Sequence, residues 1–422
     1  MYHPHSRCRA CGYGKQALPE GVKAERESQE RLESVFDLGL QPLANDWRRP
    51  GQELAGYAPL QVLSCPRCGL AQLSVVVRPD LLYSSYAYVT SKSQTMLAHF
   101  EALWADISEG RQIKSVLEIG SNDGTLLYWL ARKPAIQEVY GVEPAANLCL
   151  VAYEKNIPTF VGRFSRVAAE KIRSGAPASG YDLIIARHVL CHVDDWQDFF
   201  AGVELLSGPQ TVVCIENPYL PDILASNSFD QIYHEHLSYL SVRAMEAALE
   251  NTELEVKSVK RYPIHGGAIV LLVQRKESLA PLDFSVREFE MNEHIGPDAW
   301  AHFGLRVDEL RGDLNVKLRK FRSQGKTVAA LGASAKSTVW INHCGLTKKD
   351  IAWVADNTPG KQGCLVPGSD IEVCDEGAIL RELPDYLVIF CWNWKAAVLE
   401  KTQLARSKGV KLIFPIPQIE IV

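Results

Sequence analysis

Two CxxCG segments near the N-terminus constrain the fold of this chain more than any other feature. Cys8 and Cys11 form one pair, and Cys65 and Cys68 form the other. A CxxC turn places two thiolates on one side of a tight loop, and two such turns complete the four-cysteine site typical of structural zinc. A redox CxxC motif or coincidence is the alternative interpretation. Four thiolates leave zinc no open coordination position, so we expect a structural metal rather than a catalytic one.

The other cysteines, the chain length and the charge limit the class of protein further. The remaining cysteines stand singly in apolar segments, as reduced core residues do in a chain that starts without an apolar signal sequence. The 422 residues predict about two to four domains. Fifty acidic against 45 basic residues argue against nucleic-acid binding, and no apolar run reaches the roughly 20 residues of a membrane span. We therefore expect a cytoplasmic protein with neither nucleic acid nor membrane as partner.

A strand that runs into a glycine loop marks the middle of the chain. The apolar segment 116–119 carries Glu118 and leads to Gly120 and Gly124. This spacing differs from the dinucleotide GxGxxG and has the E/DxGxxxG arrangement of class I S-adenosylmethionine (SAM) methyltransferases. A second strand ends at Glu143, where such folds hydrogen-bond the ribose hydroxyls of the ligand. A plain α/β turn with solvated acids is the alternative. The candidate cofactor-binding residues are Glu118, Gly120, Asn122, Asp123, Gly124, Glu143, Pro144, Arg187 and His188.

Strands and helices alternate through the rest of the chain. Further strands are expected at 181–186, 211–216 and 268–273, which predicts a mostly parallel, doubly wound sheet with ligands at the carboxyl ends of its strands. Arg187 and His188 directly follow the first of these strands, so their side chains should face that cleft. A strand at 326–332 leads into a helix whose N-terminus is a potential anion site, although the second glycine that a P-loop has before its lysine is absent. A second Rossmann-like fold that serves only for packing is the alternative for this region.

A histidine-rich segment follows the strand at 211–216. Tyr233, His234, Glu235 and His236 stand in a row. Three interpretations are open: a hydrogen-bonded polar loop, a metal site, or acid–base chemistry. We favour acid–base chemistry, because a carboxylate and an imidazole that lie close together position and tune each other near neutral pH.

The ordered motifs resemble one family along almost the whole chain. They are the two cysteine pairs, DLGLQPLAN at 37–45, LEIGSNDG at 117–124, FDQIYHEH at 229–236, HGG at 265–267, LGASAKS at 331–337 and VADNTPGKQG at 354–363. This set resembles the SAM-dependent C-methyltransferases that build branched deoxysugars on nucleotide carriers for antibiotics and surface glycans. The resemblance implies an α/β protein with a zinc-binding domain (1–80), a class I Rossmann-like methyltransferase domain (81–280) and a C-terminal Rossmann-like domain (281–422) that contributes to nucleotide-sugar binding.

The resemblance also implies roles for individual residues. The family's Tyr-x-Glu-His trio falls on Tyr233, Glu235 and His236, with His236 as the base that removes a proton beside a sugar ketone and Glu235 orienting or tuning it. His192 matches a further active-site histidine. An N-terminal active-site tyrosine matches Tyr86 or Tyr88. His343 departs from the family pattern, which has a tyrosine there, and we expect this departure to alter the fit of the nucleotide sugar.

These roles predict a complete reaction. Carbon beside a ketone becomes nucleophilic once its proton is removed, and the resulting enolate attacks the methyl group of SAM. The implied substrate is a dTDP- or GDP-linked keto-sugar, and the implied assembly is a monomer or dimer. An O- or N-methyltransferase on a related sugar, which needs no enolate, and a non-catalytic zinc and Rossmann protein that binds partners are the alternatives.

Overall fold

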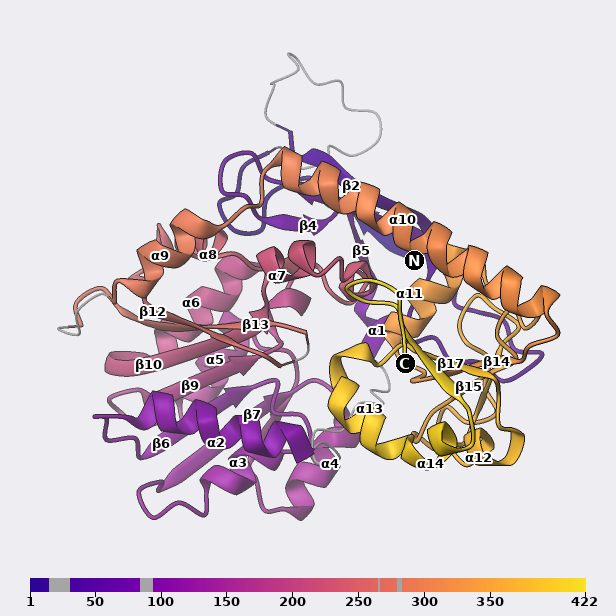
Figure 1. Ribbon diagram of the computed structural model, residues 1–422. Helices are drawn as coiled ribbons and strands as arrows, with labels where there is room; N and C mark the ends of the chain where they lie inside the picture. Colours follow the sequence, from indigo (N-terminus) through magenta and orange to yellow (C-terminus); the bar gives the residue numbers. More distant parts are fainter. Residues whose placement is uncertain (15–30, 84–93, 265, 279–282) are drawn as a thin grey trace.

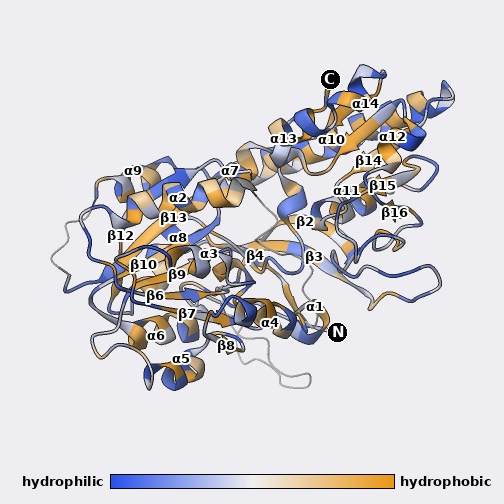
Figure 2. Cartoon of the chain, turned by 90° about the horizontal axis from the view of Figure 1, so that it is seen from below, coloured by the Kyte–Doolittle hydropathy of each residue, from blue (hydrophilic) through white to orange (hydrophobic). Residues whose placement is uncertain are grey.

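The computed structural model covers the chain and describes residues 1–14, 31–83, 94–264, 266–278 and 283–422 (Figure 1). No helix in these ranges is both long enough and apolar enough to cross a membrane. Sheets of seven, six, four and two strands form the framework. Orange strands lie between mixed blue and orange helices in Figure 2, as expected for sheets whose faces are covered by amphipathic helices.

The seven-stranded sheet occupies the middle of the chain. Its strand order is β12-β13-β10-β9-β6-β7-β8, and β13 is antiparallel to β10 while the strands from β10 to β8 pair in parallel. The predicted mostly parallel α/β sheet is therefore confirmed. Helices α5, α6 and α8 cover one face, and α2 and α3 cover the other. The strands are β6 (Ser115–Ile119), β7 (Glu138–Glu143), β8 (Thr159–Val161), β9 (Tyr181–Arg187), β10 (Ser207–Pro218), β12 (Leu254–Tyr262) and β13 (Ala268–Arg275).

The N-terminal strands form a smaller sheet that includes a strand from the middle of the chain. The order of the four-stranded sheet is β11-β4-β3-β2, with antiparallel pairs throughout. Strand β11 directly follows the histidine-rich segment, so that segment enters the N-terminal sheet. The strands are β2 (Glu33–Pro42), β3 (Tyr57–Ser64), β4 (Ala71–Leu73) and β11 (Ser238–Tyr239), and β1 (Tyr2–Pro4) pairs separately with β5 (Val75–Val77).

The six-stranded sheet forms the C-terminal part. Its order is β16-β15-β14-β17-β18-β19, parallel except at the last pair. The predicted strand at 326–332 is β14, and α11 (Ala335–Cys344) follows its glycine loop. The strands are β14 (Val328–Leu331), β15 (Trp353–Ala355), β16 (Glu372–Cys374), β17 (Tyr386–Ile389), β18 (Lys411–Phe414) and β19 (Glu420–Ile421).

Helix α10 (Pro297–Ser323) joins the N-terminal and C-terminal sheets. Trp300, Phe303, Val307, Leu310 and Leu314 recur at intervals of three or four residues and form one buried face. This face shares a single core with strands β3, β4 and β14. Figure 1 shows α10 lying along the N-terminal strands toward the C-terminal sheet. The N-terminal module is therefore packed into the rest of the chain.

The remaining helices complete the layers around the sheets. The predicted boundary at residue 280 falls before α9, but α9 packs against β12 and α8, so the middle part continues past that point. The domain limits remain a prediction. The helices are α1 (Pro79–Tyr83), α2 (Gln94–Ser108), α3 (Thr125–Leu130), α4 (Ala146–Glu154), α5 (Arg166–Arg173), α6 (Trp196–Leu206), α7 (Leu220–Ala225), α8 (Val242–Leu249), α9 (Ser285–Asn292), α12 (Ala378–Glu382), α13 (Lys395–Lys401) and α14 (Gln403–Ser407).

Candidate active site

The four predicted zinc ligands lie together. One ligand atom from each of Cys8, Cys11, Cys65 and Cys68 lies within 4.8 Å of the others. The Sγ atoms of Cys8 and Cys68 are 3.5 Å apart, and those of Cys11 and Cys65 are 3.6 Å apart. Sulfurs bound to one tetrahedral zinc at ~2.3 Å lie about 3.8 Å from one another, so this cluster has the dimensions that zinc requires.

The glycine loop after β6 is shaped by close packing and by an acid. Gly120 has φ +72°, and a Cβ there would lie 2.4 Å from Cγ2 of Val189. The Glu143 carboxylate at the end of β7 accepts from the N–H groups of Asn122 and Ala145 at 2.9 and 2.8 Å. A carboxylate has about four acceptor positions, so two remain for ribose hydroxyls. The loop therefore fits the predicted nucleoside cofactor.

Two further acids line this loop. Glu118 is buried, and burial raises its pKa to about 8. Its Oε2 is buried without a hydrogen-bond partner among the described residues. Asp123 is also buried and accepts from Nζ of Lys155 at 3.0 Å. Because an unpartnered buried carboxylate oxygen is costly, Glu118 is suited to a ligand that brings an N–H donor or a positive charge, as the ammonium group of SAM does.

Arg187 and His188 are engaged with an acid that the sequence analysis did not single out. Nε of Arg187 donates to Oε2 of Glu216 at 2.7 Å, and Nε2 of His99 lies 2.7 Å from Oε1. Burial by itself would raise the pKa of Glu216, but Arg187 and His99 lower it. Burial lowers the pKa of His188 to about 4. Arg187 and His188 remain predicted cofactor residues, with Glu216 as their protein partner.

His236 is held in one tautomer. Its Nδ1 lies 2.8 Å from the Gln231 carbonyl, and its Nε2 lies 2.6 Å from the Tyr233 hydroxyl. A carbonyl oxygen only accepts, so Nδ1 carries the proton and the Nε2 lone pair accepts from Tyr233. Burial and the nearby His192 lower the pKa of His236 well below its ordinary value. The imidazole is therefore neutral near pH 7 and has the form of a base.

His192 lies beside His236 and is also held through Nδ1 by a backbone carbonyl. Nδ1 of His192 lies 2.6 Å from the Glu235 carbonyl, which places its proton on Nδ1 by the same argument. The two ring centroids are 5.1 Å apart. The structure thus brings His192, Tyr233 and His236 together, as the sequence predicted. Tyr86 and Tyr88, the two candidates for the N-terminal tyrosine, lie outside the described residues.

Glu235 differs from its expected orientation. Among the described residues, its carboxylate accepts from Nδ2 of Asn45 at 2.7 Å and does not hydrogen-bond the His236 ring. Residues 233–236 form a turn in which the His236 N–H donates to the Tyr233 carbonyl at 2.9 Å, and the side chains of Glu235 and His236 meet different partners. The His236 ring is oriented by Gln231 instead. Burial raises the pKa of Glu235 to about 7. His234 is also turned away and contacts the Ala58 carbonyl at 3.2 Å.

The C-terminal part adds an acid and two lysines next to the histidine-rich segment. Asp230 accepts from the indole N–H groups of Trp340 and Trp392 at 3.1 and 2.7 Å. Nζ of Lys336 lies 4.3 Å from the Trp392 ring centroid, and Nζ of Lys361 donates to the carbonyl of the loop after β14 at 2.7 Å. Burial lowers the pKa of both lysines. This surface combines aromatic rings with positive charge.

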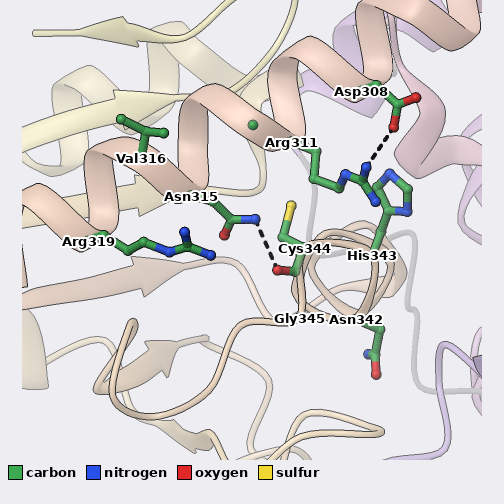
Figure 3. Close-up of a pocket in the computed structure, with 10 residues that line it drawn as sticks. Asp308, Arg311, Asn315, Val316, Arg319, Asn342, His343, Cys344 and Gly345 are labelled. Atoms are coloured by element: carbon green, nitrogen blue, oxygen red, sulfur yellow. Dashed lines mark hydrogen bonds and ion pairs between the residues drawn. The ribbon is translucent and has the colours of Figure 1, made fainter.

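An open hollow lies at a different place. It measures about 490 Å³ and lies between α10 and the C-terminal end of α11, with Arg311, Asp308 and His343 in its wall (Figure 3). Lys336 is at the opposite end of α11, and the residues between span roughly 10 Å at 1.5 Å per residue. The expected effect of His343 on nucleotide-sugar fit is therefore not supported by its position beside α10.

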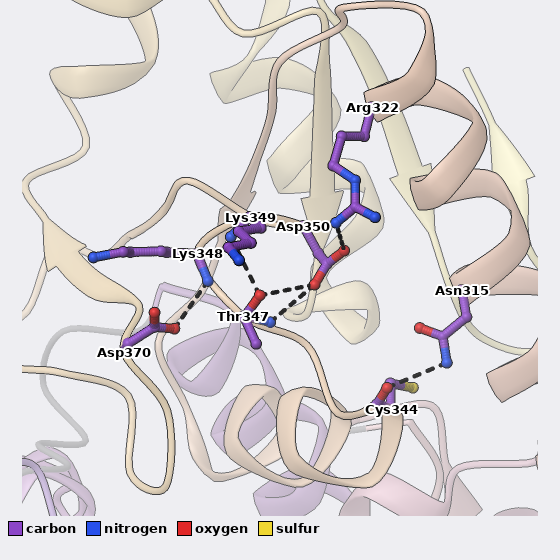
Figure 4. A network of polar contacts seen from close by, with 8 residues as sticks. All are labelled: Asn315, Arg322, Cys344, Thr347, Lys348, Lys349, Asp350 and Asp370. Atoms are coloured by element: carbon purple, nitrogen blue, oxygen red, sulfur yellow. Dashed lines mark hydrogen bonds and ion pairs between the residues drawn. The ribbon is translucent and has the colours of Figure 1, made fainter.

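Polar contacts fix this far end of α11. Asp350 pairs with Arg322 at 3.1 Å and accepts from Thr347, while Nδ2 of Asn315 donates to the Cys344 carbonyl at 3.2 Å (Figure 4). These contacts join the turn after α11 to α10. The polar groups of this region therefore stabilise the packing of the two helices, and the acid–base residues lie elsewhere.

Comparison with protein families gives three consecutive matches. A "Putative zinc binding domain" matches residues 28–83, a methyltransferase domain matches 94–259, and a C-methyltransferase C-terminal domain matches 263–417. The C-methyltransferase NovU of Streptomyces niveus is 29% identical over 432 residues, which covers 100% of this chain and 98% of that protein.

Solved structures resemble parts of the chain. The PH0226 protein of Pyrococcus horikoshii is 13% identical with a TM-score of 0.35, covering 45% of this chain and 95% of its own. The YcgJ protein of Bacillus subtilis is 17% identical with a TM-score of 0.34, covering 43% of this chain and 100% of its own.

Proposed function

Since this chain is a SAM-dependent C-methyltransferase with an N-terminal zinc-binding domain, we propose that it methylates the carbon beside a ketone in a nucleotide-linked keto-deoxysugar. The four cysteines hold the zinc, and the loop between β6 and β7 holds SAM. The observation that carries the proposal is the fixed tautomer of His236, which keeps an Nε2 lone pair in the site. A carbon acid needs such a base, whereas most heteroatom nucleophiles need less help.

In the proposed reaction His236 removes the proton. The Tyr233 hydroxyl releases Nε2 and turns to the ketone oxygen; Nε2 then takes the proton from the carbon beside the ketone, and the electrons of that C–H bond form the enolate. Because Tyr233 lies 2.6 Å from His236, its hydroxyl is close enough to donate to the enolate oxygen, which would stabilise the charge as it forms. When bound, SAM supplies an electrophilic methyl group that the enolate carbon accepts.

The nucleotide diphosphate is proposed to bind the C-terminal wall. Lys336 and Lys361 bring two positive charges to the glycine loop after β14, and the N-terminus of α11 adds its dipole. Both ammonium groups are partly buried, and an anionic ligand would compensate for that burial. These charges fit the diphosphate, and the family resemblance implies dTDP or GDP as the carrier.

Exchange of the substrate's α-proton tests the chemistry. The enzyme is incubated with a keto-sugar nucleotide in deuterated water, with S-adenosylhomocysteine in place of SAM. The natural protein should incorporate deuterium, and His236→Asn should lose about 10²–10⁴-fold in exchange rate. The control His294→Asn makes the same change at an exposed histidine and should exchange normally. Methyl groups found on oxygen or nitrogen in the product, or normal exchange by His236→Asn, would reject the proposal.

A further inference from the structure

Arg9 lies inside the first zinc knuckle yet contacts the segments that carry both active-site histidines. It stands between Cys8 and Cys11, and its side chain is buried. Nε and Nη2 of Arg9 lie 3.1 and 3.0 Å from Oδ1 of Asp194, and Nη1 donates to the Leu237 carbonyl at 3.3 Å. Asp194 is two residues after His192, and Leu237 directly follows His236.

The two histidine segments are also tied to each other. The Leu237 N–H donates to the Cys191 carbonyl at 2.7 Å, and the His192 ring donates to the Glu235 carbonyl at 2.6 Å. Arg9 adds a third connection, because it contacts Asp194 in one segment and Leu237 in the other. Because these contacts involve backbone groups next to the imidazoles, they determine where the two rings lie relative to each other.

The backbone of the knuckle fixes Arg9 itself. The Arg9 N–H donates to Oε1 of Gln72 at 3.0 Å, and Nε2 of Gln72 donates back to the Arg7 carbonyl at 3.0 Å. Gln72 lies in β4, the strand that pairs with β11. The position of Arg9 thus depends on the fold that the four cysteines stabilise.

We propose that Arg9 is a positioning residue that sets the geometry of His192 and His236 and so couples the zinc knuckle to proton abstraction. A guanidinium group suits this task, since its planar donors bind Asp194 and Leu237 at once. A lysine has one nitrogen and cannot reproduce both contacts. This inference rests on the proposed function, because the step it affects is removal of the α-proton.

The second knuckle provides a matched control. Arg67 has the same place between Cys65 and Cys68, but its side chain is 57% exposed, and among the described residues its ion-pair partner is the exposed Glu250 at 3.4 Å. An exposed pair of this kind contributes little. Arg9→Met and Arg67→Met therefore make the same chemical change at equivalent knuckle positions, and only Arg9 contacts the histidine segments.

Four measurements on the zinc-loaded protein separate positioning from folding: zinc content by mass spectrometry, SAM affinity by calorimetry, α-proton exchange, and the pH profile of methyl transfer. In Arg9→Met we expect about one zinc per chain, SAM affinity within about twofold of the natural protein, and exchange and turnover both reduced roughly 10- to 100-fold. The pH profile should shift because the environment of His236 changes. Arg9→Lys should recover part of the rate, and Arg67→Met should change nothing.

Two results would overturn the inference. If Arg9→Met exchanges the α-proton and turns over at the rates of the natural protein, Arg9 has no part in the mechanism. Loss of zinc or of SAM binding in parallel with the rate would make Arg9 a folding residue of the knuckle. The proposed function fails separately, when the natural protein itself neither exchanges the α-proton nor places the methyl on carbon; a specific loss of turnover in Arg9→Met would still identify it as a positioning residue.

Discussion

The seven-stranded and six-stranded sheets close their glycine loops in the same way. In the first, Glu143 accepts from the loop N–H of Asn122 at 2.9 Å and from the N–H two residues after itself at 2.8 Å. In the second, Asp356 accepts from the loop N–H of Ala333 and from the N–H two residues after itself, both at 2.8 Å. The same backbone arrangement therefore occurs twice in one chain.

The charges beside the two loops are opposite. Glu118 and Asp123 line the first loop, whereas Lys336 and Lys361 lie beside the second. An acidic loop suits a cofactor with a sulfonium and an ammonium group, and a basic loop suits a diphosphate. The comparison teaches that the same backbone loop can carry side chains of opposite type, and under the proposed function these side chains select the ligand.

Removing both lysines should produce the largest change in ligand affinity. In Lys336→Met/Lys361→Met we expect affinity for dTDP or GDP to fall by more than about 100-fold, since each lost charged hydrogen bond costs about 1.5–3 kcal/mol. SAM affinity should stay unchanged. Calorimetry with each ligand measures both values, and equal weakening of SAM would break the assignment of separate ligands to the two loops.

The matching change in the first loop is Glu143→Ala. We expect SAM affinity to fall about 10- to 100-fold while affinity for the nucleotide diphosphate is retained. Circular dichroism controls for the fold, because Glu143 also holds its own loop. Unchanged SAM binding would show that the acid only closes the loop, as in the second sheet.

The acid Glu118 should make stability depend on pH. Its pKa is raised from 4.5 to about 8, so between these values the native state keeps a proton that the unfolded state releases. The contribution of Glu118 to stability is therefore full below pH 4.5 and is lost as pH rises toward 8, by on the order of 1 kcal/mol per pH unit. Melting temperatures measured at a series of pH values report this loss, and Glu118→Gln should flatten their dependence on pH between pH 5 and 8. Bound SAM should flatten it in the natural protein, and an unchanged slope in both experiments would contradict the placement of Glu118.

The smallest effect on ligand affinity is expected where the histidine-rich segment meets the C-terminal part. Trp392→Phe removes the indole N–H that donates to Asp230 and keeps an aromatic ring beside Lys336. Loss of this hydrogen bond to a charged group should lower the free energy of unfolding by about 1–3 kcal/mol, with little change in SAM affinity. Thermal denaturation with and without SAM measures this. A large loss of SAM affinity would mean that the two loops do not act separately.

Local patterns predicted much of this architecture. The strands at 116–119 and 181–186 are mostly apolar with one acid each, and both are largely buried in the parallel sheet. The cysteine pairs predicted their own cluster because each knuckle is a local turn. Each strand and each knuckle depends on residues that are close in sequence, and the meeting of the two knuckles was predicted from the four thiolates that zinc requires.

The missed contacts connect residues that are far apart in sequence. Glu216 meets His99 and Arg187, and no local pattern joins these positions. The one available signal was an acid at the end of an apolar strand. Glu235 was expected to tune its neighbour His236, but the direction of each side chain depends on the backbone of the segment. The sequence identified the residues of the site better than it identified their partners.

The pairing of β4 with β11 sets an order for folding during synthesis. Strand β4 leaves the ribosome early, but its partner, Ser238–Tyr239, is made only after most of the seven-stranded sheet. At roughly 5–20 residues per second, the edge of β4 waits on the order of ten seconds. An unpaired edge strand is a site where other chains can add. The first knuckle, which lies beside β4, is thus made long before the strand that completes its sheet, and a chain truncated before residue 238 would leave that edge permanently open.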